Sequence, residues 1–253
     1  MTLMTKALTL FLLVGLLTQT GCSTTSRAQR ERTAQAHYKL GLSYLNDNRL
    51  QQAFVEFQKS VEANPKERDA RYALGHIYFV QGKMEEAQKE FKIALKSDAD
   101  FSEAHNYLGK VYERKGEWEQ AISEYKKALV NRKYATPHFA HYNLGIAFMN
   151  TRNDEGALKE FEEALRIDPS YSPAYQGRGA VFFRNSRYKE AIEAFQQSLR
   201  LTPDNPDVHY NLGEAFFKEG SREQAREEFE KVIKLVPEGE LAKNSKQYLD
   251  QLR

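Results

Sequence analysis

The chain has 253 residues, of which 28% are charged, and its 37 Lys and Arg against 35 Asp and Glu leave a formal net charge of only +2. This balance argues against a nucleic-acid-binding protein, which usually carries an excess of clustered basic residues. Seven prolines and fourteen glycines do not fit a disordered or fibrous chain, and the abundance of Leu, Ala, Glu, Lys and Gln predicts helices.

The first segment, residues 1–21, has the pattern of a signal peptide. Lys6 supplies a positive charge, and residues 7–17 form an apolar run of 11 residues. A run of this length suits the core of a signal peptide and is shorter than the roughly 20 residues of a membrane-spanning helix. Cys22 follows as the only cysteine in the chain, so no internal disulfide bond can form.

The stretch QTGC at residues 19–22 resembles the lipobox of bacterial lipoprotein precursors, although an aliphatic residue is usual at the place of Gln19. The resemblance implies that the signal peptide is removed and that Cys22 carries acyl chains such as palmitate. Two or more chains hold a protein stably on a membrane, whereas one binds marginally. Ser23 implies the outer membrane, with the protein facing the periplasm, and the polar residues 22–33 predict a flexible tether. The alternative is a soluble periplasmic protein with a free thiol.

A repeat of 34 residues occupies most of the remaining chain. It is marked by six glycines, which are 34 residues apart except for one interval of 36: Gly41, Gly75, Gly109, Gly145, Gly179 and Gly213. When each of these glycines is numbered position 8, position 20 is alanine and positions 11 and 24 are aromatic in all six repeats. Position 7 is leucine in five repeats and Arg178 in the fifth, and position 32 is proline in four.

These regularities predict pairs of helices. Positions 4, 7, 8 and 11 fall on one face of a first helix, and positions 20, 24 and 27 fall on one face of a second. The small residues at positions 8 and 20 predict a close crossing of the two helices, with the aromatic residues filling the space beside it. Between the helices, position 15 is a residue that tolerates left-handed backbone in four repeats: Asn48, Gly82, Gly116 and Gly220.

The pattern resembles the tetratricopeptide repeat (TPR) over residues 34–237. The fold expected is all-α: a right-handed α-solenoid of six TPR helix pairs plus a C-terminal capping helix. The repeats are expected at residues 34–67, 68–101, 102–137, 138–171, 172–205 and 206–237, and the capping helix at residues 238–253. The apolar residues of the cap are expected to pack inward: Leu241, Tyr248, Leu249 and Leu252.

The single interval of 36 places two extra residues between the third and fourth repeats. The longer linker spans residues 132–136, and Pro137 fits the first turn of a helix that starts near His138. The extra length leaves both flanking helices intact. It predicts a slight break between two stacks of three repeats each.

The lipobox, the six repeats and the enlarged linker with Tyr134 and Pro137 together resemble the type IV pilus biogenesis lipoproteins, the pilotins of the PilF and PilW kind. The resemblance implies a non-enzymatic scaffold that brings the secretin, a ring-forming channel, to the outer membrane and promotes its multimerisation, and hence pilus assembly and twitching or gliding motility. Holding secretin protomers near the bilayer raises their local concentration. The alternatives are TPR lipoprotein scaffolds for outer-membrane protein assembly, cell-wall enzyme complexes or exopolysaccharide secretion.

Positions 2, 5, 9 and 12 usually line the concave face of a TPR superhelix, and in this chain they are rich in apolar and aromatic residues. The predicted partner-binding groove comprises Tyr38, Leu42, Leu45, Tyr72, His76, Phe79, Tyr142, Ile146 and Met149. Phe139, Phe183, Tyr210 and Phe217 extend this strip. An open apolar strip predicts a helical or extended apolar segment of the secretin as its ligand. The alternative is that curvature of the array buries part of the strip against neighbouring helices.

Other kinds of site find little support in the sequence. A TPR carboxylate clamp needs Lys and Asn where this chain has Tyr38 and Leu42. Position 4 carries a histidine in four repeats, which predicts packing residues: His37, His105, His141 and His209. His138 and His141 lack a third ligand for a metal. No phosphate loop, GxSxG or HExxH motif occurs, so neither an enzyme, a cofactor nor a small-molecule substrate is predicted.

Overall fold

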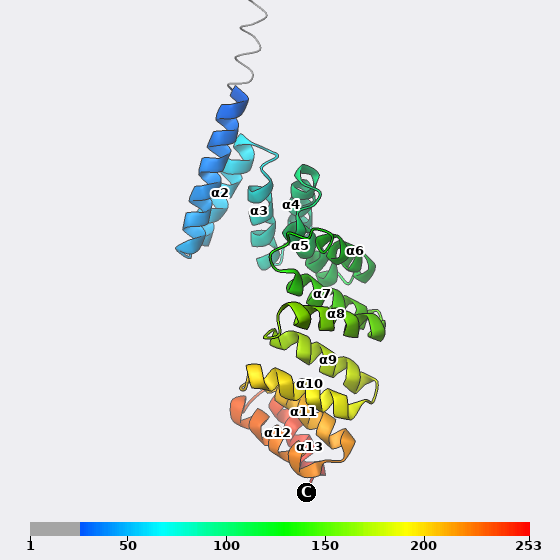
Figure 1. Ribbon diagram of the computed structural model, residues 1–253. Coiled ribbons are helices and arrows are strands. Elements are labelled where there is room, and N and C mark those ends of the chain that lie inside the picture. The colour runs from blue at the N-terminus through cyan, green and yellow to red at the C-terminus, as the bar shows by residue number, and fades with distance from the viewer. Residues whose placement is uncertain (1–25) are drawn as a thin grey trace, which may run out of the picture. The chain divides into compact units, whose positions relative to one another are not determined.

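The computed structural model describes residues 26–253, and every regular element in that range is a helix (Figure 1). The first helix spans residues 26–46. The others are α2 (Leu50–Ala63), α3 (Arg68–Val80), α4 (Met84–Ser97), α5 (Ser102–Arg114), α6 (Trp118–Ala128), α7 (Pro137–Asn150), α8 (Asp154–Ile167), α9 (Ser172–Arg184), α10 (Tyr188–Leu201), α11 (Pro206–Glu219), α12 (Arg222–Leu235) and α13 (Glu240–Gln251). The predicted signal peptide and Cys22 lie outside the described residues.

The helices form two compact units, and the boundary between them falls between Val111 and Tyr112, inside α5. The predicted break at residues 132–136 is therefore not where the chain divides. The longer linker is held in place, because Tyr134 is 8% exposed and packs with Ala128 of α6 and Ala140 of α7. The two extra residues thus bring a buried tyrosine between neighbouring repeats rather than a gap.

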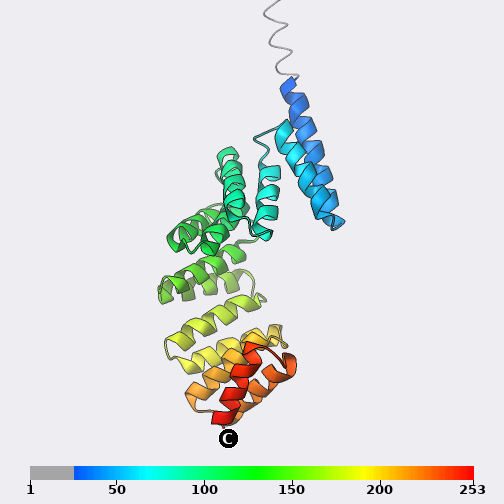
Figure 2. The ribbon, with the colours of Figure 1, turned by 180° about the vertical axis from the view of Figure 1, so that it is seen from behind.

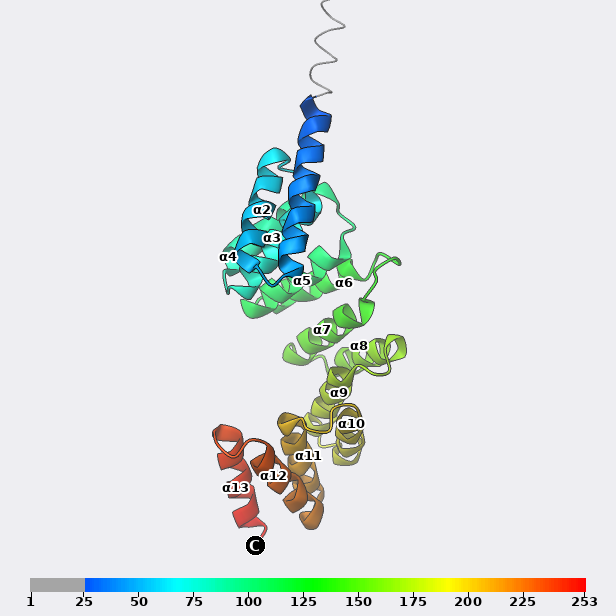
Figure 3. The same cartoon turned by 90° about the vertical axis from the view of Figure 1, so that its left-hand side faces the viewer.

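In the first unit, the first helix packs beside α2, as Figures 1 and 3 both show. Ser60, near the end of α2, donates a hydrogen bond of 2.7 Å to the carbonyl of Ala34, which ties the two helices together. The predicted tether is wrong over residues 26–33, which belong to this helix. Its residue types favour helix, and Arg27 pairs with Glu31 one turn later at 3.1 Å.

In the second unit, the helices from α6 to α13 follow one another along the stack, and each packs on the next. The last helix, α13, lies against α12 (Figures 2 and 3). The ring of Tyr248 stacks on Phe229 with centroids 4.6 Å apart, and Leu252 is 2% exposed. The C-terminal helix therefore covers the apolar side of the sixth repeat, as its sequence predicts.

The glycine at position 8 makes room for the aromatic ring at position 24. A β-carbon on this glycine would lie 2.5–2.9 Å from a ring carbon in five pairs: Gly41–Phe57, Gly75–Phe91, Gly145–Phe161, Gly179–Phe195 and Gly213–Phe229. Real β-carbons essentially never make contacts under 3.0 Å, so the ring or the backbone would have to shift. The ring, rather than the alanine at position 20, is what forces position 8 to be small.

The turn between the paired helices has left-handed backbone in all six repeats. The φ angles at position 15 are 57° at Asn48, 76° at Gly82, 74° at Gly116, 63° at Arg152, 58° at Ser186 and 98° at Gly220. The sequence predicts four of these turns. It does not reveal those at Arg152 and Ser186, because neither residue type is typical of this conformation.

Candidate functional site

In the first repeat, the predicted groove residues lie on the first helix with unequal exposure. Leu42 is 38% exposed, whereas Tyr38 and Leu45 are partly buried against a cluster that includes Phe57. The rings of Tyr38 and Phe57 have centroids 5.8 Å apart. Leu42 is thus the most accessible apolar group among the three predicted residues.

In the second repeat, the predicted groove is closed by the next repeat of the same unit. The hydroxyl of Tyr107 in α5 forms a hydrogen bond of 3.0 Å with Nε2 of His76. The centroid of the Tyr107 ring lies 5.8 Å from those of Tyr72 and Phe79. Phe101 covers Tyr72 from 5.0 Å. The prediction that Phe79 lines an open groove is wrong, because Phe79 is only 7% exposed beneath Tyr107.

The charge state of His76 within this closed aromatic cluster follows from its surroundings. Burial lowers the pKa of His76, and the nearby ammonium of Lys110 lowers it further. Lys110 itself lies 5.0 Å from the ring centre of Tyr107, within the range of a cation–π contact. His76 is therefore neutral near pH 7 and serves the cluster as a hydrogen-bonding partner of Tyr107.

In the fourth repeat, Tyr142, Ile146 and Met149 lie on α7 and are partly buried. They pack against a cluster from α8 and α9 and against Tyr171. Phe139, at the start of α7, is 41% exposed and meets the Tyr171 ring edge-to-face at 5.4 Å. The exposed apolar groups of the predicted strip are thus Leu42 in the first unit and Phe139 in the second.

The tyrosines around Phe139 are neutral at physiological pH. Burial raises the pKa of Tyr171 to about 12, with Tyr142 and Asp168 adding to the effect, and burial also raises the pKa of Tyr142. Each keeps a phenolic O–H beside an apolar surface. Such a surface suits contact with another protein chain better than recognition of an ion.

The position-4 histidines pack as predicted, and His37, His141 and His209 each hydrogen-bond to the glutamate at position 23 of their own repeat. The Nδ1–Oε2 distances are 2.6 Å for His37–Glu56, 2.7 Å for His141–Glu160 and 2.5 Å for His209–Glu228. In the second repeat, Arg71 replaces the histidine and pairs with Glu90 at 2.7 Å. The glutamate recurs in five repeats, a signal that the sequence analysis missed.

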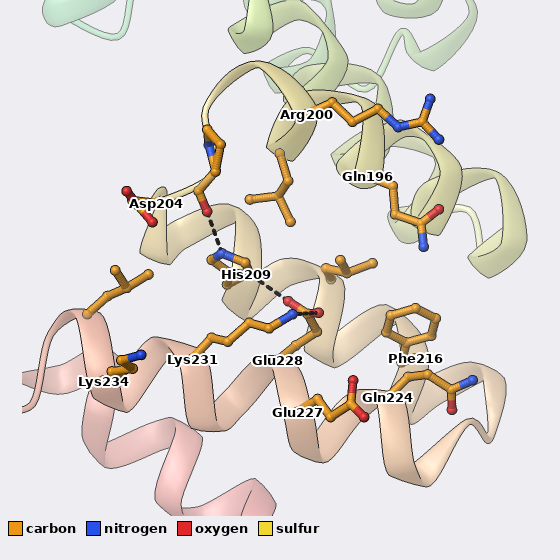
Figure 4. Close-up of a pocket in the computed structure, with 14 residues that line it drawn as sticks. Gln196, Arg200, Asp204, His209, Phe216, Gln224, Glu227, Glu228, Lys231 and Lys234 are labelled. Atoms are coloured by element: carbon orange, nitrogen blue, oxygen red, sulfur yellow. Dashed lines mark hydrogen bonds and ion pairs between the residues drawn. The ribbon is translucent and has the colours of Figure 1, made fainter.

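In the sixth repeat this pair lies in a groove between α10, α11 and α12 (Figure 4). His209 Nε2 is 2.7 Å from the carbonyl of Pro203, and Lys231 donates to Glu228 over 2.7 Å. The hydrogen bond to Glu228 raises the pKa of His209 despite burial. Burial acts to raise the pKa of Glu228, but the donors His209 and Lys231 outweigh it and lower that pKa. The pair is thus a charged link between helices.

No cluster of three or more potential metal ligands occurs within residues 26–253. Nε2 of His138 lies 4.0 Å from Asp168. Nor does the described part of the chain contain a helix with the length and apolarity needed to cross a bilayer. Cys22, the predicted lipidation site, lies outside it.

Comparison with protein families gives matches to tetratricopeptide repeat models over most of the array. The models described as "Tetratricopeptide repeat" match residues 38–91, 72–136, 138–171 and 206–238, and one described as "TPR repeat" matches residues 181–220. Comparison with curated proteins gives no match.

Comparison with solved structures gives many matches, among them two pilus proteins. PilF of Pseudomonas aeruginosa is 20% identical, with a TM-score of 0.77 over 89% of this chain and 100% of that one. PilW, described as a widely conserved type IV pilus biogenesis factor, is also 20% identical, with a TM-score of 0.77 over 83% of this chain and 97% of its own. YrrB, a TPR protein with an unusual peptide-binding site, is 23% identical with a TM-score of 0.59. At these identities the similarity establishes the fold.

Proposed function

Because the chain belongs to the tetratricopeptide repeat family, we propose that it is a non-enzymatic protein-binding scaffold and, more specifically, a pilotin. In this role it is anchored to the outer membrane and promotes the localisation and multimerisation of the type IV pilus secretin. Pilus assembly and twitching or gliding motility depend on that step.

The observation that carries the proposal is the extent of the similarity to PilF. The match includes the whole of that chain and 89% of this one at a TM-score of 0.77, whereas YrrB covers 76% at 0.59. The similarity to PilF therefore extends along nearly the whole array rather than over a few repeats. The lipobox and the linker with Tyr134 support the same reading.

Attachment to the membrane would act on the first repeat most directly. The first helix is already formed at residue 26, four residues after the proposed lipidation site Cys22. Four extended residues reach at most roughly 14 Å, so lipid on Cys22 would hold this helix close to the bilayer surface. A secretin segment bound there would be concentrated at the membrane in which the ring assembles.

The binding surface proposed is the open part of the inner strip. Leu42 in the first repeat and Phe139 in the fourth are the exposed apolar residues of that strip. An apolar segment of the secretin would bury Leu42 on the first unit, whereas Phe139 offers a separate contact on the second unit, beside the ring of Tyr171. Tyr72, His76 and Phe79 contribute to folding of the first unit rather than to direct contact.

Deletion of the gene, followed by a blot for heat-resistant secretin multimers and fractionation of the monomer, tests the proposal. The expected result is loss of multimers and of secretin from the outer membrane, with recovery on complementation by the wild-type chain. Complementation with Cys22→Ser separates the anchor from the array, since it should give a stable protein that restores localisation poorly. Normal secretin multimers in the outer membrane of the deletion strain would contradict the proposal that this protein is a pilotin.

A further inference from the structure

The fifth repeat has an inter-repeat groove that differs from its counterpart in the sixth. The groove lies between α8, α9 and α10 and has a volume of about 640 Å³. Apart from Arg187, its lining residues correspond, 34 positions earlier, to residues that line the His209–Glu228 groove of Figure 4. None of them belongs to the predicted inner strip. The two grooves therefore share a backbone framework but carry different side chains.

Arg178 is the main difference between the two grooves. It stands at position 7, where the corresponding leucines are 2–3% exposed in four repeats: Leu74, Leu108, Leu144 and Leu212. Its guanidinium lies 5.7 Å from the ring centre of Phe182. Its Nε is buried without a hydrogen-bond partner, and no ion pair joins it to a carboxylate within residues 26–253.

In other repeats, the glutamate at position 23 pairs with a cationic side chain at position 4, a place that Tyr175 takes in the fifth repeat. Arg71 pairs with Glu90 at 2.7 Å, and His209 pairs with Glu228 at 2.5 Å. In the fifth repeat, position 23 is Ala194, which is 5% exposed and leaves no acidic group at that place. A buried donor without a partner is unfavourable, so a carboxylate entering from outside would meet an Arg178 guanidinium that is already partly desolvated.

Acidic residues at the rim do not fill this role. Glu190 is engaged by Arg187, whose Nε donates to it over 2.9 Å. Glu162 and Glu193 also line the groove but are exposed, and neither comes within ion-pair distance of Arg178. Exposed carboxylates remain hydrated and are screened by salt, so they oppose an incoming anion only weakly.

We propose that the groove of the fifth repeat binds a glutamate or aspartate side chain of a partner protein through Arg178. The carboxylate takes the place that the position-23 glutamate occupies in neighbouring repeats. A guanidinium offers two parallel N–H donors that match a carboxylate, and the Phe182 face restricts its orientation. Gln197, at the position of Lys231 in the sixth repeat, can donate a further hydrogen bond from its amide.

The test is a nuclear magnetic resonance titration of the ¹⁵N-labelled full chain from residue 22 onward, with Cys22→Ser to keep it free of lipid. The arginine Nε–H signals are followed while N-acetyl-glutamate amide is added at constant ionic strength. The Arg178 signal is assigned by its loss in Arg178→Leu. N-acetyl-glutamine amide is the uncharged matched probe, and N-acetyl-alanine carries only a C-terminal carboxylate.

The proposal expects a saturable shift of the Arg178 signal with the glutamate probe and a much smaller one with the glutamine probe. In Arg178→Leu, the backbone amides of Ala194 and Gln197 should then no longer respond. If the glutamate probe shifts the Arg178 signal no more than that of the exposed Arg200, the proposed site is wrong. An equal or larger response to N-acetyl-alanine overturns the assignment to a side-chain carboxylate. Neither result bears on secretin assembly, so the pilotin proposal is tested separately.

Discussion

A β-carbon on Gly177 would lie 2.6 Å from Cζ of Phe161, a residue of the preceding repeat. The same ring closes over Gly145 of its own repeat, also at 2.6 Å. Phe161 is fully buried, so the ring cannot move aside without opening the core. One side chain therefore joins two neighbouring repeats, and two glycines make the space for it.

Gly177→Ala should destabilise the protein even though alanine is the better helix former. Helix propensity favours the change by about 1 kcal/mol, whereas overpacking of a filled core usually costs about 1–3 kcal/mol. We expect a net loss of free energy of unfolding in a denaturant titration. Phe161→Leu in the same chain should recover part of that loss. Additive effects of the two substitutions would contradict direct contact between these residues.

Arg152→Gly should stabilise the protein. Arg152 has a φ of 63°, and a non-glycine residue pays about 1–2 kcal/mol for left-handed backbone. Burial lowers the pKa of Arg184 and the nearby charge of Arg152 lowers it further, so removal of that charge also relieves a repulsion. Gly82→Ala is the matched opposite, because Gly82 has a φ of 76° and open space around it, and it should destabilise. A lower melting temperature for Arg152→Gly would contradict the turn assignment.

Arg178→Leu should raise stability by about 1 kcal/mol, because it removes a partly buried donor that has no partner. The reverse change, Leu212→Arg, places a charge where the wild-type side chain is 2% exposed, and it should lower stability by several kcal/mol. Thermal unfolding of both variants beside the wild type measures this contrast. An unchanged or lower stability of Arg178→Leu would mean that the arginine already has a stabilising role in the fold.

The His209–Glu228 pair should contribute most to stability in mildly acidic solution. The pKa of His209 is raised above its ordinary 6.5, so its contribution is complete below that pH and is lost as the pH rises through the folded-state pKa. The pKa of Glu228 is lowered below its ordinary 4.5, so its contribution is complete above that pH and is lost on acidification. Both conditions hold between about pH 4.5 and 6.5.

The measurement for this pair is the free energy of unfolding of wild type minus His209→Gln across that pH range. We expect a difference of roughly 1.5–3 kcal/mol at its maximum, the usual value of a hydrogen bond to a charged group. His76→Gln is the control of opposite sign, because burial lowers the pKa of His76 and the wild type should lose stability relative to that variant as the pH falls below 6.5. A pH-independent difference for His209→Gln would show that the pair is not ionised.

The helix pairs and their register can be predicted from the sequence because side-chain size recurs in fixed positions. Gly145, Ala157 and Phe161 are compatible with one another only if two helices cross at that place, so the pattern carries three-dimensional information. The left-handed turns at Arg152 and Ser186 carry no such signal, because the flanking helices impose the conformation.

The accessible part of the predicted strip could not be derived in the same way. Whether Phe79 is open depends on Tyr107, which comes from the next repeat and lies at a position that the strip rule omits. For Leu40 the prediction fails in the opposite direction, since a residue expected to be buried is exposed. At position 7 it is predicted to be a core residue, yet it is 43% exposed, because no helix of a preceding repeat covers it among the described residues. Exposure depends on neighbours in space, which the repeat pattern alone does not specify.

Leu40 and Leu42 also provide the matched pair for the central claim. They are 43% and 38% exposed and lie two residues apart on the first helix, so they point to different faces. Leu42→Glu changes the proposed secretin-binding strip, whereas Leu40→Glu adds the same charge outside it. Circular dichroism and melting curves should confirm that both variants remain folded.

The decisive measurement is the yield of heat-resistant secretin multimers in the deletion strain complemented with wild type, Leu42→Glu or Leu40→Glu at equal protein levels. The account predicts multimer yield near wild type with Leu40→Glu and a loss of at least several-fold with Leu42→Glu. Equal yields from the two variants would contradict binding of the secretin at this face of the first repeat.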